Sequence, residues 1–183
     1  EIHSAWGTFE WLIEDAFDLG LRVGVVANSD GHKGRPGASH PGASEFVAYG
    51  GLTCLLAPDL TRDALFFCLR KRRHFATTGS RMHLDLNVTA ASDMTVWDRD
   101  PAVFDDAVSV DAVTVEMGDI VSVQSDAVSL RFAVEAGVPI EKVEVRNGKD
   151  TVACLRPYTV DEVGSRIRVL LSGAERRGKG SRS

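Results

Sequence analysis

Several features that would place a protein in a particular class are scarce in this chain of 183 residues. It has only three cysteines, Cys54, Cys68 and Cys154, which are widely spaced and lie among apolar neighbours. This arrangement is typical of reduced thiols in a core, and it gives neither a disulfide framework nor a zinc site. We therefore expect the cysteines to be structural, and we favour a cytoplasmic location.

Long apolar runs and an excess of positive charge are also missing. The longest apolar stretches, such as Val23 to Ala27, are far shorter than the roughly 20 apolar residues that a membrane span requires. The formal net charge is -5, so the chain has no overall attraction for nucleic acid or for an anionic membrane. We expect neither as a partner. Hydrophobic residues make up 44% of the chain, which is enough for one large core or two small ones.

The first part of the chain has the pattern of an α/β protein. The apolar residues at positions 9, 12, 13, 16 and 17 follow the spacing of one helical face, and Gly20 is suited to end that helix. The apolar run from Arg22 to Ala27 lacks strict alternation, which indicates a strand covered on both faces. A second helix is predicted from Thr61 to Arg73, with Asp59 or Thr61 as its cap.

The second helix ends in four consecutive cations, Arg70-Lys71-Arg72-Arg73. One interpretation is a site for phosphate or nucleic acid. The other, which we favour, is that cations in the last turn complement the helix dipole.

After Gly79 the hydrophobic period changes to two, which is typical of antiparallel strands. With turns such as Asn147-Gly148 between the runs, the pattern predicts a β-sandwich-like domain. We therefore expect an α/β plus all-β protein, with a first domain over residues 1–82 and a second over 83–183. The predicted strands lie at residues 83–88, 109–110, 113–116, 120–123, 128–134, 142–145 and 166–170.

The stretch "ANSDGHKGRPG", residues 27–37, follows the predicted buried strand. Asp30 and His32 therefore fall just beyond the carboxyl end of a strand, where α/β folds place their active sites. In an Asp-x-His sequence both side chains lie on the same side of an extended backbone, so a carboxylate oxygen and an imidazole nitrogen can reach one divalent ion. The alternative is an ordinary turn, with Asp30 bonded to backbone amides and His32 in solvent.

Other polar residues could join this pair. His3 precedes the first helix and would lie at the end of the preceding strand, so we consider it a further metal ligand. Lys33, Arg35 and His40 follow in the same loop. Cations beside a metal suit a small anionic substrate such as a phosphate ester. A solvated loop with ordinary charges is the competing interpretation.

Two segments, "EIHSAWGTFEWLIEDAFDLGLRVGVVANSDGHKGRPG" and "TRDALFFCLRKRRHFATTGSR", resemble the C-terminal part of the PHP (polymerase and histidinol phosphatase) superfamily. The chain is most similar to the bacterial branch in which a β domain follows the barrel. The resemblance implies a distorted (β/α)7 barrel, related to the TIM barrel, with two or three divalent metals at the carboxyl ends of its strands. Asp30 and His32 match the family's last metal motif, Asp-x-His.

The family's opening His-x-His motif and its central Glu and His ligands have no counterpart in this sequence. On the resemblance they would lie upstream of Glu1, together with any targeting signal. The chain is then expected to be the C-terminal fragment of a longer enzyme, which by itself would not assemble a complete metal cluster. The metal's identity stays open, since His and carboxylate ligands suit Zn, Mn and Fe alike.

The sequence and the resemblance together favour a metal-dependent hydrolase, specifically a phosphoesterase that uses a metal-activated water. The alternative is a non-catalytic binding module in which the β-sandwich contacts a protein or a carbohydrate. Neither the substrate nor the oligomeric state follows from the residues.

Overall fold

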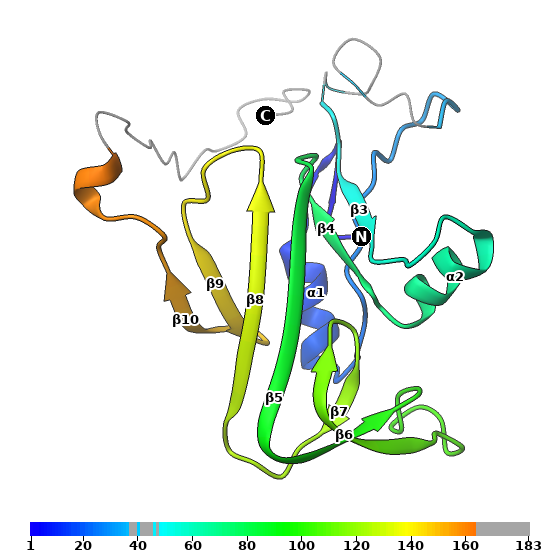
Figure 1. Cartoon of the computed structure of the whole chain (residues 1–183). Helices are drawn as coiled ribbons and strands as arrows, with labels where there is room; N and C mark the ends of the chain where they lie inside the picture. Colours follow the sequence, from blue (N-terminus) through cyan, green and yellow to red (C-terminus); the bar gives the residue numbers. More distant parts are fainter. Residues whose placement is uncertain (37–39, 41–45, 47, 164–183) are drawn as a thin grey trace.

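The computed structural model describes residues 1–36, 40, 46 and 48–163, and most of its regular structure is β-strand (Figure 1). The described residues form one four-stranded sheet and three two-stranded sheets. The helices are α1, Glu10–Asp18, and α2, Arg62–Arg70, with a short 3₁₀ helix at Val160–Val163. No helix in the described part of the chain is long and apolar enough to cross a membrane.

The chain begins with a small hairpin formed by β1, His3–Ser4, and β2, Gly7–Thr8. After α1 the chain returns beside β1, and His3 and Ala27 form a parallel bridge. On either side of this bridge, the Ile2 amide donates a hydrogen bond to the Val26 carbonyl at 2.8 Å, and the Asn28 amide donates one to the His3 carbonyl at 3.2 Å. The first 29 residues therefore make one parallel crossover through a helix.

A second hairpin packs beside this crossover. Strand β3, Leu52–Leu55, pairs antiparallel with β4, His74–Thr77, and α2 lies between them in the sequence. The hydroxyl of Thr53 accepts the Ala27 amide at 3.0 Å and donates to the Ala27 carbonyl at 2.8 Å. These two hydrogen bonds join the β3–β4 pair to the crossover. The hydroxyl of Thr61 caps α2 by accepting the Ala64 amide at 3.3 Å, as predicted for one of the two candidate caps.

The main sheet is organised around one long strand, β5, Met82–Trp97. It pairs antiparallel with β6, Ser109–Glu116, with β7, Ile120–Ser122, and with β8, Val128–Ala136. The first half of β5 pairs with β8 and its last residues pair with β7. The register with β6 shifts between Thr89 and Met94, which is the position of a bulge.

The last hairpin consists of β9, Val143–Asn147, and β10, Asp150–Leu155. Gly148 in its turn has a φ of 59°, as the predicted Asn-Gly turn requires. Side chains of this hairpin reach α1. Arg146 lies 3.3 Å from Glu14, and Lys149 pairs with Asp18.

Buried apolar side chains come from both parts of the chain. Ala27, Cys68 and Phe75 are buried around the crossover and the second hairpin, whereas Met94, Val115 and Ile120 are buried in the main sheet. Cys68 is in the core as predicted, but Cys54 is half-buried and Cys154 is exposed. The apolar face of α1 contains exposed Leu12 and Phe17.

The predicted fold class is therefore wrong. The described residues form small, mainly antiparallel sheets with only two short α-helices, and they close no barrel. The predicted TIM-barrel-like architecture fails because the run Arg22–Ala27 is not a continuous strand; only Ala27 makes a bridge. The alternating runs after Gly79 were correctly predicted as antiparallel strands. The predicted strand at 166–170 lies outside the described residues.

Candidate functional site

The backbone of the parallel crossover brings two chain segments to one edge. The Ala5 amide donates to the Ser29 carbonyl at 3.2 Å, and the Gly51 amide donates to the Asn28 carbonyl at 2.8 Å. Because the segments at 2–5 and 26–29 run in the same direction, the residues that follow them emerge on the same side. Trp6 and Asp30 are those residues.

Asp30 and His32 lie together just past this edge. Their nearest side-chain atoms, Asp30 Oδ1 and His32 Nε2, are 3.7 Å apart, and both side chains are substantially exposed. Asp30 has a φ of 51°, in the left-handed region that few non-glycine residues adopt. Such backbone conformations concentrate at functional sites. The geometry thus agrees with an outward-facing pair of ligands.

Trp6 contacts both members of this pair, a role that the sequence did not predict. Its indole Nε1 donates to the Asp30 carbonyl at 3.1 Å. Its ring meets the His32 imidazole edge to face, with centroids 5.1 Å apart, and it meets Phe46 in the same manner at 4.7 Å. The available signal was its position two residues after β1, where the parallel segment ends.

His3 lies in β1 and does not join the pair. Its Nδ1 is 2.7 Å from the Thr8 hydroxyl across the first hairpin, and the residue is half-buried. Within the described residues, no group of three or more His, Cys, Asp or Glu side chains is arranged to hold a metal. The structure thus brings two of the three predicted metal ligands together.

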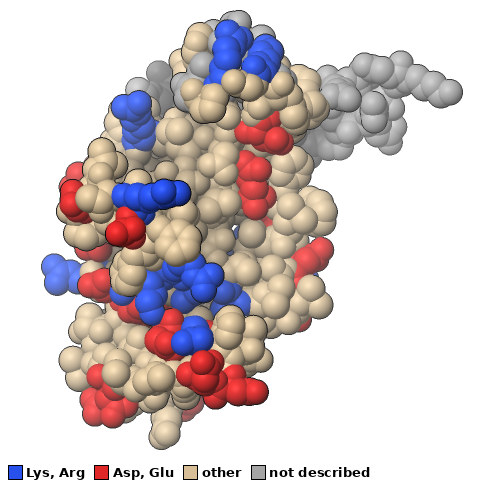
Figure 2. Space-filling model, turned by 90° about the vertical axis from the view of Figure 1, so that its right-hand side faces the viewer, with Lys and Arg blue, Asp and Glu red and all other residues tan. Residues whose placement is uncertain are grey.

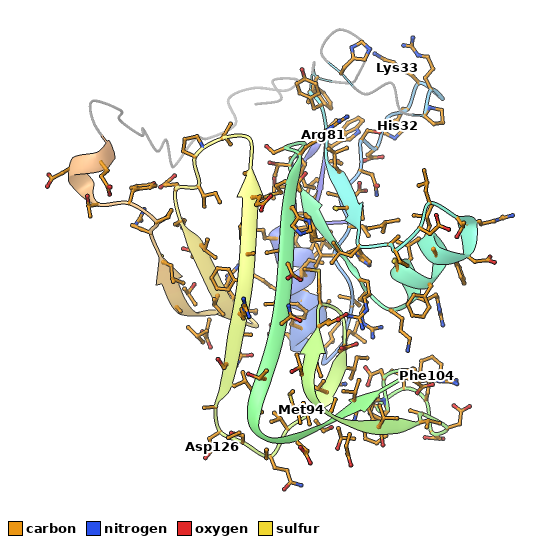
Figure 3. All side chains as sticks on the ribbon, in the orientation of Figure 1. His32, Lys33, Arg81, Met94, Phe104 and Asp126 are labelled. Atoms are coloured by element: carbon orange, nitrogen blue, oxygen red, sulfur yellow. The ribbon has the colours of Figure 1, made fainter. Side chains whose placement is uncertain are left out.

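The predicted substrate-binding residues Lys33, Arg35 and His40 are all exposed and follow the pair in the chain. Figure 3 shows His32 and Lys33 at one end of the molecule, above the sheets. His74 is buried in β4, with its Nδ1 3.1 Å from the Val25 carbonyl. It is therefore a core residue and lies outside the candidate site.

The separation of the two ligand atoms suits a shared ion. Ligand atoms bound to one tetrahedral zinc at about 2.1 Å lie roughly 3.4 Å from each other. The observed 3.7 Å between Asp30 Oδ1 and His32 Nε2 is close to that value, and both side chains are free enough to adjust. The pair can supply two ligands, one oxygen and one nitrogen.

Comparison with known proteins adds a family but no function. No curated protein and no solved structure matches the chain. The family described as "Protein of unknown function (DUF3604)" matches residues 33–144, which include the loop that carries Lys33, α2 and the whole main sheet. This match extends over more than half of the 183 residues, and the chain therefore belongs to the DUF3604 family.

Proposed function

We propose that Asp30 and His32 bind a divalent metal ion and that the protein is a metal-dependent hydrolase acting on small phosphate esters. The observation that carries the proposal is the 3.7 Å separation of Asp30 Oδ1 and His32 Nε2 at the shared end of two parallel segments. The left-handed backbone at Asp30 and the indole bond from Trp6 to the Asp30 carbonyl support it, since both fix the backbone from which the exposed carboxylate extends. The resemblance to the PHP superfamily supports it independently, because the pair matches the Asp-x-His motif.

The residues around the pair suit an anionic substrate. A divalent ion would supply an activated water and would polarise a phosphoryl oxygen. Lys33 and Arg35 would then neutralise the phosphate, and His40 would contribute a further donor. The imidazole of His32 is oriented by the Trp6 ring, which excludes solvent from one edge of the ligand.

Two protein ligands do not complete the coordination of a catalytic metal, which usually has three. In PHP proteins the remaining ligands belong to earlier motifs. We propose that a full cluster needs them in addition to Asp30 and His32. The described residues on their own are thus expected to bind metal weakly and to show little or no turnover.

Metal binding tests the proposal directly. We would titrate the protein with Mn²⁺ and follow the free ion by electron paramagnetic resonance. The wild type should bind one ion, and Asp30→Ala and His32→Ala should each weaken binding roughly tenfold or more, the usual scale for a lost metal interaction. Asp85→Ala and His83→Ala are matched controls, because both residues are exposed on β5.

Two results would contradict this function. One is Mn²⁺ binding that is equal in Asp30→Ala and in the β5 controls. The other is metal-stimulated hydrolysis of p-nitrophenyl phosphate, in any form of the protein that contains the earlier motifs, which persists at the wild-type rate after Asp30→Ala.

The binding-module alternative has one observation in its favour. Val108 and Val110, beside and on β6, are 63% and 64% exposed, and their even spacing puts them on the same face. Exposed apolar side chains on a sheet edge are typical of a surface that meets a protein partner. Under this alternative Asp30→Ala changes nothing, whereas Val110→Asp abolishes the interaction.

A further inference from the structure

A groove with many cations lies on a different part of the molecule. Its cavity measures about 560 Å³, a size typical of small-molecule sites. Three segments that are distant in the sequence line it: residues 21–23, the end of α2 with Lys71 and Arg72, and the loop after β5. Figure 2 shows Lys and Arg side chains gathered in the lower middle of this face, with acidic side chains around them.

Cations outnumber carboxylates in the lining of this groove. Asp98 and Asp100 are its acidic residues, and its five cations are Arg22, Arg70, Lys71, Arg72 and Arg99. The stabilisation of a helix end explains at most the cations at the end of α2. Arg22 and Arg99 belong to other segments, where each pairs with an aspartate, and both still face the groove.

Several of these cations retain donors for a ligand. Arg22 bonds Asp100 at 2.8 Å through one nitrogen, and Arg99 contacts Asp98 through Nε and Asp106 through Nη1, each at 3.3 Å. Each guanidinium has five N–H donors, so these contacts leave others open. The Arg70 side chain makes no hydrogen bond or ion pair within the part of the chain that the structure describes, and it is exposed at the groove.

Arg72 is half-buried in the lining of the groove. Its Nε donates to the Gly118 carbonyl at 3.0 Å, and its Nη1 donates to the Arg70 carbonyl at 3.4 Å. Burial lowers the pKa of Arg72, while Asp100 and Asp119 act against that shift. Burial removes water from the charged guanidinium of Arg72, and an anion bound in the groove would compensate for that lost hydration.

The rest of the lining is apolar. Leu21, Val23, Val103 and Phe104 face the same cavity, and the Arg99 guanidinium lies over the Phe104 ring, 5.5 Å from its centroid. A wall of this kind fits a ring or hydrocarbon body, and the cations fit a charged group attached to it.

We propose that this groove is a binding site for a small organic phosphate, a phosphate monoester attached to an apolar or aromatic body. The phosphate would lie between Arg70 and Arg99, and the body would pack on Phe104 and Val103. Guanidinium groups favour phosphate because their planar forks match its oxygens. The site is separate from Asp30 and His32: Figure 3 shows Phe104 near the opposite end of the molecule from His32.

The test uses phenyl phosphate as the probe, titrated into the whole chain by calorimetry with EDTA present, so that metal binding and hydrolysis do not contribute. We expect one site, with affinity that falls as salt is added. Arg70→Ala should weaken binding roughly tenfold, the effect of losing one charge-assisted hydrogen bond. Arg62→Ala is the matched control, because it removes the same charge from the other end of α2.

The apolar wall is tested with Phe104→Ala. This variant should weaken phenyl phosphate while leaving the weaker binding of inorganic phosphate unchanged. Circular dichroism spectra confirm that each variant is folded. Asp30→Ala should bind phenyl phosphate as the wild type does, so the two proposals fail separately.

Three results would overturn the groove proposal. They are no heat of binding with the wild type, equal affinity in Arg70→Ala and Arg62→Ala, and equal affinity for phenyl phosphate and uncharged phenol. The first excludes a site, the second places binding outside the groove, and the third shows that the charged group is not recognised.

Discussion

The guanidinium of Arg73 lies 3.0 Å from the carboxylate of Asp119, and this pair joins the end of α2 to the turn between β6 and β7. The same guanidinium contacts Glu116 at 2.8 Å and donates to the Met117 carbonyl at 3.0 Å. Arg72 donates to the next carbonyl, that of Gly118, at 3.0 Å. The basic run after α2 therefore binds the main sheet as well as complementing a helix dipole.

Removing the Arg73 side-chain charge should destabilise the fold. Arg73→Met leaves the half-buried Asp119 carboxylate and the Met117 carbonyl without this donor, which costs about 2 kcal/mol. Urea unfolding measures the change. Lys142→Met is the control, because Lys142 pairs with Glu144 at the surface, where solvent screens the ion pair, and it should lower the free energy of unfolding less than Arg73→Met does. An equal loss of unfolding free energy in the two variants would show that the Arg73 contacts do not stabilise the packing of the α2 end against the β6–β7 turn.

Gly118 should tolerate no side chain. It has a φ of 89°, and a Cβ there would lie 2.3 Å from the Lys71 carbonyl oxygen. Gly118→Ala should therefore lower the free energy of unfolding by about 2 kcal/mol, through backbone strain and displacement of the α2 end. Gly137→Ala is the matched control, since nothing lies within 4 Å of its added Cβ. A thermal melt that is equal for the two variants would contradict the close packing at Gly118.

Acid should weaken the protein through Asp100. A hydrogen bond from the Ala102 amide, and then the Arg22 guanidinium, hold the pKa of the Asp100 carboxyl below its ordinary value of 3.8. A carboxyl whose pKa is lowered by folding contributes stability that is full above its ordinary pKa and is lost as the pH falls through the folded value. The wild type should therefore lose more stability than Asp100→Asn as the pH falls below that ordinary value.

Urea unfolding at pH values from about 5 to about 2 measures this difference. Asp126→Asn is the control, because in the part of the chain that the structure describes Asp126 makes no hydrogen bond or ion pair. If the free energy of unfolding falls equally with pH in the wild type and in Asp100→Asn, the Asp100 carboxyl does not contribute to acid destabilisation.

The three cysteines should differ in reactivity. Cys154 is exposed in β10, Cys54 is half-buried in β3, and Cys68 is buried, with its thiol donating to the Leu56 carbonyl at 3.3 Å. With an excess of a thiol-specific disulfide reagent we expect Cys154 to react first and Cys68 only upon unfolding, because reaction needs an accessible thiolate. The Cys154→Ser variant should lose the fast phase alone. A fast phase that persists in this variant would contradict the burial of the other two thiols.

The elements with a long periodic pattern were predictable. The apolar spacing that begins at Phe9 predicted α1, and the spacing after Thr61 predicted α2. The alternating runs predicted β6 to β9 and the first part of β5, at 83–88, because one face of each strand meets neighbours and the other meets solvent. The continuation of β5 to Trp97 was not predicted. Strands β3 and β4 were missed, since each has four residues and their pairing is interrupted by α2. Strand β10 was missed as well, because its six residues are all exposed and show no inward face.

The barrel prediction depended on a family resemblance rather than on periodicity, and the structure contradicts it. The run Arg22–Ala27 is apolar, but it contributes a single parallel bridge instead of a ladder. At the candidate site, the spacing of Asp30 and His32 was enough to predict their proximity. The role of Trp6 was not predictable, because its contacts with Asp30 and His32 depend on a crossover that brings residues 24 to 26 positions apart together.

The single long strand β5 also sets an order for folding. Its nearest partner in the sequence is β6, whose first pair is Trp97 with Ser109, followed by β7 at Ile120. The pairs with β8 begin with Ala90 and Val128 and extend to Met82 and Ala136. Since closing a longer loop costs more chain entropy and slows folding, we expect the β5–β6 pairing to form first and the β8 pairing, which closes the longer loop, to form later.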